Sequence, residues 1–176
     1  MATKQTFTAG QVLTAAQLNT LQDYVGVVQV QSVAKTDTFT TTSTTFTDIT
    51  GLSVSITPTS ATNKVLVVVA LSIGGPAGEG SLYQIVRGST AIGIGDTAGS
   101  RIRTGTQTTS NSTNRMVAGV LAFLDTPATT SATTYKIQMR ITSSDTAAQI
   151  NRSNTDTDNA AFARGVSTIT VYEVTP

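Results

Sequence analysis

The chain has 176 residues, which is enough for one domain with a hydrophobic core, or one domain and a small appendage. Only 12% of the residues are charged and the net charge is +1, which argues against a nucleic-acid binder and against docking on anionic membranes. The chain has no Cys and no His, so it lacks the ligands of the usual zinc sites and the commonest general base. No apolar run approaches the roughly 18 residues of a membrane helix, and no signal peptide is visible, so we expect no membrane insertion.

Threonine makes up about a fifth of the chain. Because Thr is both β-branched and polar, it suits the solvent-facing side of a strand and keeps a protein soluble with little charge. Many fibre and shell proteins have this composition, and so do some lectins and adhesins.

A short helix is predicted near the N-terminus. Thr14 and Gln17 have the spacing of a capping box, and Leu13 with Leu18 occupies the two positions of a hydrophobic staple. Gly26 is expected to end this helix.

The same helix carries an apolar stripe of heptad type, Leu18, Leu21 and Val25. This stripe indicates either a helix packed on its own domain or a three-chain bundle and anchor in a larger particle. We expect residues 1–28 to form an attachment segment and residues 29–176 a β-sandwich domain. The candidate contact residues are Leu13, Leu18, Leu21 and Val25.

After Gly26 the pattern predicts strands and turns only. Several segments alternate apolar and polar side chains, as a strand with one wet face does. The predicted strands are 27–33, 45–50, 52–57, 64–73, 82–87, 90–94, 116–124, 134–142 and 166–174. Residues 104–114 are predicted as an exposed loop or edge strand, and residues 151–159 as a polar loop.

This order predicts an all-β fold, an antiparallel β-sandwich of jelly-roll type with one short N-terminal helix. Less than a fifth of the chain should be helical, against about a third in typical domains. The predicted core includes Val65, Val67, Val69, Leu121, Phe123, Ile137, Met139 and Ile169.

Candidate sites for chemistry are weak. The glycines of residues 93–99 miss the dinucleotide-loop spacing by one position, so a turn or bulge is the preferred interpretation. Residues 156–159 offer oxygen ligands for Ca²⁺ but lack the Gly and Glu of an EF-hand loop, so a solvated loop is favoured. Because nothing pairs Glu79 or Glu173 with a second carboxylate, no glycosidase site can be named. We therefore predict no catalytic residues, no cofactor, no metal site and no enzyme activity.

Arginine outnumbers lysine, and most Arg residues fall in or beside predicted strands. Arg is favoured in interface ion pairs and stacked contacts, so these residues indicate either an interface or scattered surface charge. They are Arg87, Arg101, Arg103, Arg115, Arg140, Arg152 and Arg164.

Two parts of the chain resemble known virion proteins. Residues 7–19 (FTAGQVLTAAQLN) resemble the start of many phage tail-fibre and related virion proteins. The Thr-rich region resembles a family of phage fibre or decoration domains, common in aquatic phages, at residues 37–39, 48–58, 82–99, 135–140, 151–153 and 167–174. The resemblance implies a trimeric virion protein and brings no catalytic residues.

These observations together predict a non-enzymatic structural protein of a bacteriophage virion, of fibre or knob type and attached through its N-terminal segment. Its expected partners are two further copies of itself and other virion proteins, with a host-surface glycan as a further candidate and no nucleic acid. Two alternatives stay open, a capsid decoration (cement) protein and a carbohydrate-binding adhesin or lectin module.

Overall fold

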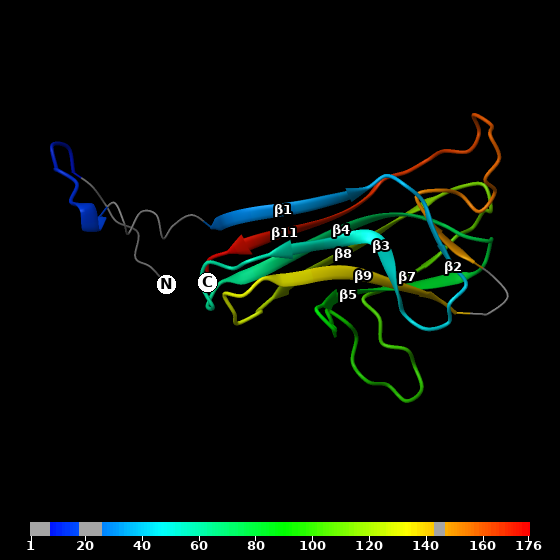
Figure 1. Ribbon diagram of the computed structural model, residues 1–176, viewed down its shortest axis with the longest axis horizontal. Coiled ribbons are helices and arrows are strands. Elements are labelled where there is room, and N and C mark those ends of the chain that lie inside the picture. The colour runs from blue at the N-terminus through cyan, green and yellow to red at the C-terminus, as the bar shows by residue number, and fades with distance from the viewer. Residues whose placement is uncertain (1–7, 18–25, 143–146) are drawn as a thin grey trace.

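Eleven strands and one short helix are present in the computed structural model, which describes residues 8–17, 26–142 and 147–176 (Figure 1). The strands are β1 (Val27–Lys35), β2 (Phe39–Thr41), β3 (Thr47–Ile56), β4 (Lys64–Gly74), β5 (Gly80–Arg87), β6 (Thr90–Ile92), β7 (Thr106–Thr109), β8 (Val117–Asp125), β9 (Thr133–Ile141), β10 (Ala148–Ile150) and β11 (Ser167–Val174).

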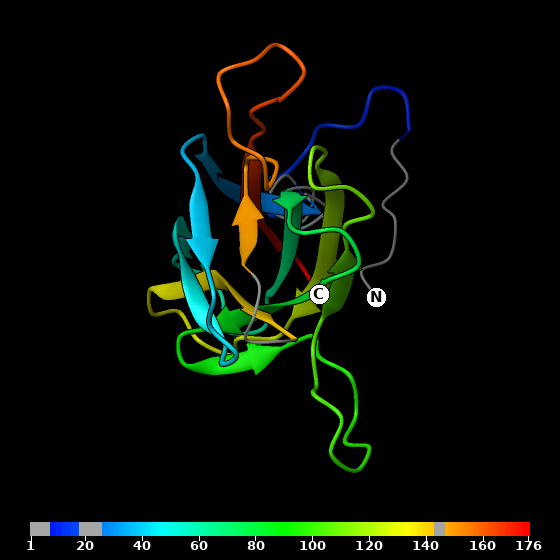
Figure 2. The same ribbon diagram turned by 90° about the vertical axis from the view of Figure 1, so that its right-hand side faces the viewer.

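The strands form two antiparallel sheets that pack face to face (Figure 2). In the six-stranded sheet, β4 pairs with β11 and β10 along one edge and with β8 along the other, and β1 and β2 extend the sheet outward. The five-stranded sheet has the order β3-β9-β5, with β6 and β7 on the far edge of β5. The order β1-β11-β4-β8 facing β3-β9-β5-β7 is that of a jelly roll, which confirms the predicted fold class.

The core lies between the sheets because alternate residues of the long strands point inward. In β11 the inward row contains Ile169 and Val171, and in β9 it contains Tyr135, Ile137 and Met139, all fully buried. Seven of the eight predicted core residues are buried. The eighth, Phe123, is half-buried and packs against the cluster.

Gly51 lies inside β3, which is one bent strand and not the two strands predicted on either side of it. Its φ of +81° is in the left-handed region, which favours glycine. The pairing of β3 with β9 shifts register between Asp48 and Ser53. Between these pairs β3 has three more residues than β9, an irregularity that interrupts the pairing without ending the strand.

Strand boundaries differ from the prediction at several ends. β1 continues to Lys35 and β8 to Asp125, while β6 stops at Ile92. The short strands β2 and β10 were not predicted. They pair with each other, Ile150 opposite Phe39, and three residues are too few to show a period of two. β7 is an edge strand, as one of the two interpretations of residues 104–114 required.

The predicted helix start is confirmed. The Thr14 backbone N–H donates to Gln17 Oε1 at 2.9 Å, and the Gln17 N–H donates to Thr14 Oγ1 at 3.2 Å, the two bonds of a capping box. Helical residues in the described part of the chain are Ala15–Gln17, consistent with the low predicted helix content. No helix there is long and apolar enough to cross a membrane.

Candidate functional site

The outward side of the six-stranded sheet carries mainly apolar side chains. On β8 every second residue points outward and is exposed, and Val120 and Leu124 are 64% and 47% exposed. The strand register places these residues beside the outward row of β4. The two rows are Ala118, Val120, Ala122 and Leu124 on β8, and Leu66, Val68, Ala70 and Ser72 on β4.

The same surface continues across the next two strands. The outward rows there are Thr168, Thr170 and Tyr172 on β11, and Val28, Val30, Ser32 and Ala34 on β1. We call these four rows the outer apolar face. No member of it is Asp, Glu, Lys or Arg, and the nearest charge on β4 is Lys64 at its first residue. This face therefore lacks the charged side chains that are usual on a sheet surface exposed to water.

The outward side of the five-stranded sheet has the opposite character. Lys136 Nζ and Gln138 Nε2 both donate to the Asp48 carboxylate at 2.7 Å, and these bonds lower the pKa of Asp48. Gln84 Nε2 joins this network by donating to Gln138 Oε1 at 2.8 Å. The Arg140 guanidinium lies 6.0 Å from the centre of the Phe46 ring. The outward side of this sheet therefore carries the charged and amide groups that are usual on a sheet surface facing water.

Glu173 on β11 points toward the core and is fully buried. Its carboxylate accepts hydrogen bonds from Asn63 Nδ2 and Gln29 Nε2 at 2.6 Å, and from the Thr59 N–H and Oγ1 at 2.7 and 2.8 Å. Burial raises the pKa of Glu173, but the bonds from Asn63, Gln29 and Thr59 together outweigh it and bring the pKa to about 2. This carboxylate has the chemistry of a structural anion, because all its bonds favour the charged form.

Asp125, the last residue of β8, also points inward. Arg87 Nη1 donates to both carboxylate oxygens at 2.8 Å, and the Tyr135 hydroxyl donates to Oδ2 at 2.7 Å. Burial raises the pKa of Tyr135, and the adjacent Asp125 raises it further. Since Arg87 and Tyr135 belong to the five-stranded sheet, this cluster ties the two sheets together.

A third buried polar cluster joins β1 to the segment after β10. Asn151 is fully buried at a φ of +66°. Its Nδ2 donates to the carbonyls of Lys35 and Asp37 at 2.8 and 2.9 Å, and its Oδ1 accepts from Ser167 Oγ at 2.7 Å. Lys35 Nζ, itself buried, bonds Asp37 at 2.8 Å and lowers the pKa of that carboxyl. Residues 151–159 form a loop as predicted, but its first residue is a core residue of the structure.

One of the two aspartates of that loop forms ion pairs. Asp156 lies 2.8 Å from Arg164 and 3.4 Å from Arg152. Each oxygen of the Asp156 carboxylate therefore has a guanidinium partner.

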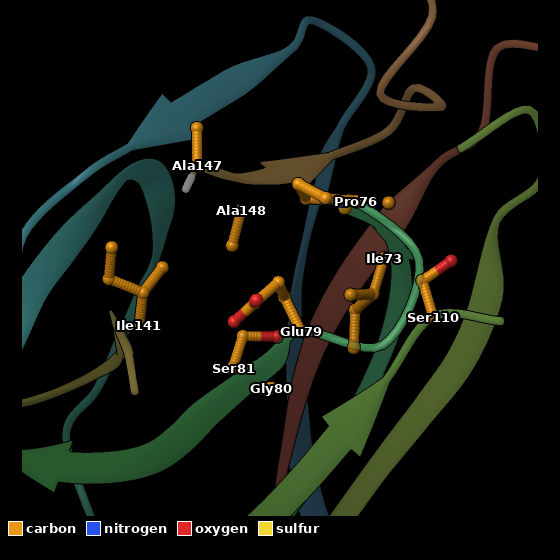
Figure 3. A pocket seen from close by; sticks show the side chains of 11 residues that line it. Ile73, Pro76, Glu79, Gly80, Ser81, Ser110, Ile141, Ala147 and Ala148 are labelled. Atoms are coloured by element: carbon orange, nitrogen blue, oxygen red, sulfur yellow. The ribbon is translucent and has the colours of Figure 1, made fainter. Parts of the chain in front are cut away.

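Figure 3 shows a small space where the β4–β5 loop meets β10. Ile73, Ile141 and Ala148 line it together with Glu79 and Ser81. Its volume is about 10 Å³, which has room for no more than one water molecule. A substrate-sized ligand therefore does not fit this cavity.

The predicted contact residues are only partly visible. Leu13 is 40% exposed, next to Val12, which is 86% exposed. Leu18, Leu21 and Val25 lie outside the described residues. The structure therefore does not bring the four residues together as a described cluster.

Five of the seven arginines have partners within the chain. Besides Arg87, Arg152, Arg164 and Arg140, the side chain of Arg103 donates to the Gly95 carbonyl at 2.6 Å. These five side chains therefore have contacts within the chain, and the interface interpretation of the arginines stays a prediction.

Sequence reasoning missed that face although a signal was present. Residues 65–71 and 116–124 are nearly continuous apolar runs. Such runs are typical of strands covered on both sides. In this chain the inner side is covered by the core and the outer side is bare.

No protein-family model matches the chain, and no curated protein matches it. Among solved structures, the backbone is similar to a chain in the "Crystal structure of infectious bursal disease virus VP2 subviral particle", with a TM-score of 0.39 and 12% identity. The match covers 83% of this chain and 37% of that chain, so this protein spans well under half the length of the VP2 chain. At this identity and TM-score the similarity assigns no family, and the resemblance to phage fibre proteins stays a prediction.

Proposed function

We propose that this chain is a non-enzymatic structural subunit of a virus particle, specifically a fibre or knob protein of a bacteriophage virion attached through residues 1–28. The observation that carries the proposal is the outer apolar face. A building block of an assembly needs a broad, uncharged surface to bury, whereas an enzyme needs a cleft with converging polar groups.

The use of the buried ionisable groups also supports a structural role. Glu173 and Asp125 each have partners that hold strands or sheets together, and the buried Lys35 is paired with Asp37 two residues further along the chain. A catalytic acid or base would instead have a free position facing a substrate site. The resemblance of residues 7–19 to virion proteins adds an independent reason for placing the assembly on a phage.

Immunogold electron microscopy tests the location. Antibodies raised against the purified chain would be applied to particles from lysates of the cells that produce it. Label at the tail is the expected result, and label spread over the capsid would favour the decoration protein. Particles without label would contradict a virion role, and binding of the isolated chain on a glycan array would then favour the lectin.

The non-enzymatic part needs its own test. Purified chain should not hydrolyse polysaccharide from the host surface. Reproducible turnover that is abolished by Ala at Asp96, Asp156 or Asp158 would contradict the proposal.

A further inference from the structure

We infer that the outer apolar face is the surface through which copies of this chain bind one another. The inference rests on the proposed assembly role and names the partner of that surface. Its most exposed residues on β8, Val120 and Leu124, lie beside Ala70 and Leu66 on β4, which the register places directly opposite them.

The chemistry of the face selects its occupant. A charged side chain pressed onto it would lose its hydration and find no counter-charge, because the four rows contain none. A glycan would need several hydrogen-bonding side chains. Of the five hydroxyls on the face, Ser72 donates to the Val166 carbonyl at 3.0 Å and Ser32 bonds Thr170 at 2.8 Å, which leaves Thr168 and Tyr172 on β11. The partner must therefore present an uncharged, largely apolar surface of its own. This chain has such a surface, so a second copy fits.

The size of the face agrees with this partner. Four strands about 4.8 Å apart, each showing about seven residues at about 3.3 Å per residue, project roughly 450 Å². The largest apolar patch on a typical monomer is about 300–600 Å², and a standard complex buries about 800 Å² on each partner. The outer apolar face is thus as large as the largest apolar patch of a typical monomer and supplies a little over half of a standard interface, so its edges must supply the rest of the contact.

The edge of the sheet points the same way. β8 pairs in its sheet with β4 alone, so it is an edge strand. Monomeric proteins protect long edge strands with lysine, proline or bulges, but residues 117–124 contain no charged residue and no proline, and their pairing with β4 has no register shift. An edge without protection beside an apolar face is expected where a neighbouring subunit covers both.

An assembly of copies through this face can close on itself, because the β8 side of one face can pack on the β1 side of the next. Such an oligomer has a mass that is a multiple of the 18.2 kDa chain mass.

Light scattering and sedimentation of the full chain at micromolar concentration test the inference. V120E introduces a charge at an exposed position of the face, and S55E introduces the same charge at an exposed position of β3 on the other sheet. We expect V120E to raise the dissociation constant at least 100-fold while S55E leaves it unchanged. A monomeric wild type at 100 µM, or equal association of V120E and wild type, would overturn the inference.

A second measurement does not depend on the folding of the charged variant. The chain has no cysteine, so V120C and S55C each provide a single thiol for a maleimide reagent. Above the dissociation constant the thiol of V120C should react at least tenfold more slowly than that of S55C, and dilution should remove the difference. Equal rates at every concentration would count against the interface. A monomer that still labels virions would refute this inference alone, and an oligomer absent from particles would refute the virion role alone.

Discussion

The outward surfaces of the two sheets have opposite compositions. The five-stranded sheet presents Asp48, Lys136 and Gln138 to solvent in one hydrogen-bonded group, whereas the six-stranded sheet presents alanine, valine and leucine. The six-stranded sheet is not poor in ionisable residues, because Lys35, Asp125 and Glu173 all belong to it. These three side chains point inward, and Lys64 at the start of β4 is the half-buried exception, so most charges of the sheet lie on its inner side although its outer side is largely apolar. This difference in composition is the reason for proposing that the outer apolar face is covered in an assembly.

The largest expected effect separates the inner and outer sides of one strand. Leu121 and Leu124 lie on β8 with exposed fractions of 6% and 47%. Leu121→Ala should cost about 3 kcal/mol of unfolding free energy because it leaves a cavity in the core. Leu124→Ala should cost about 1 kcal/mol or less in the monomer. Urea denaturation of dilute protein measures both, and equal losses would show that the outer face is packed within the monomer.

The next effect concerns the buried charge of the six-stranded sheet. The folded pKa of Glu173 is about 2, below its ordinary value of 4.5, so its ionisation stabilises the fold above about pH 5. That contribution, about 3 kcal/mol, should be lost as the pH falls toward 2.

Glu173→Gln should therefore lower stability at pH 7 and remove most of the acid dependence between pH 5 and 2. Glu79→Gln is the matched control, because Glu79 is the only other Glu in the chain and lies outside this network. Its effect on the denaturation midpoint should be under about 0.5 kcal/mol. A steep acid transition that persists in Glu173→Gln would assign the pH dependence to other groups.

A smaller effect distinguishes a tyrosine between the sheets from one on the outer face. Tyr135→Phe removes the hydroxyl that bonds the buried Asp125 carboxylate and should cost about 1–2 kcal/mol. Tyr172→Phe, on the outward row of β11, should change stability by less than about 0.5 kcal/mol. Thermal unfolding monitored by circular dichroism compares them, and a larger loss for Tyr172→Phe would reverse the assignment of the two faces.

The smallest effect belongs to the solvated sheet. Asp48→Asn breaks the ion pair with Lys136. The Asp48 side chain is 49% exposed and the Lys136 side chain is 27% exposed. The cost should be about 0.2–1 kcal/mol in dilute buffer and should shrink in 1 M salt, because exposed pairs are weak and screened. Urea midpoints at the two salt concentrations measure it. A loss of stability that does not depend on salt would mean that the Asp48 network is shielded from solvent, as the buried network of Glu173 is.

Much of the fold could be predicted from local patterns. The capping box at Thr14 and Gln17 and the alternation in β9 and β11 each involve residues close in sequence, and each was found where expected. The irregularity at Gly51 could not be predicted as such, since a glycine between two alternating segments reads equally well as a turn. The three-residue strands β2 and β10 have no periodic signal of their own.

The burial of the polar core residues could not be predicted from local sequence patterns. Glu173, Lys35 and Asn151 belong to residue types that are usually exposed. Asn63 meets Glu173 across 110 residues of sequence, and Asn151 reaches Lys35 across 116. Only the folded chain brings these partners together, so burial of the charged or amide group depends on contacts that no local window contains.

The sequence by itself determined the all-β class, most of the strands, the start of the helix and seven of the twenty buried residues of the apolar core, because strand periodicity and capping are local properties of the chain. The tertiary structure alone decided which apolar rows are covered. Residues 65–71 and 116–124 carry apolar side chains on both sides, and the jelly-roll order lays the second sheet over only one of them. A residue is buried when another layer of the structure packs over it. The outer apolar face can therefore be recognised only once the arrangement of the two sheets is known.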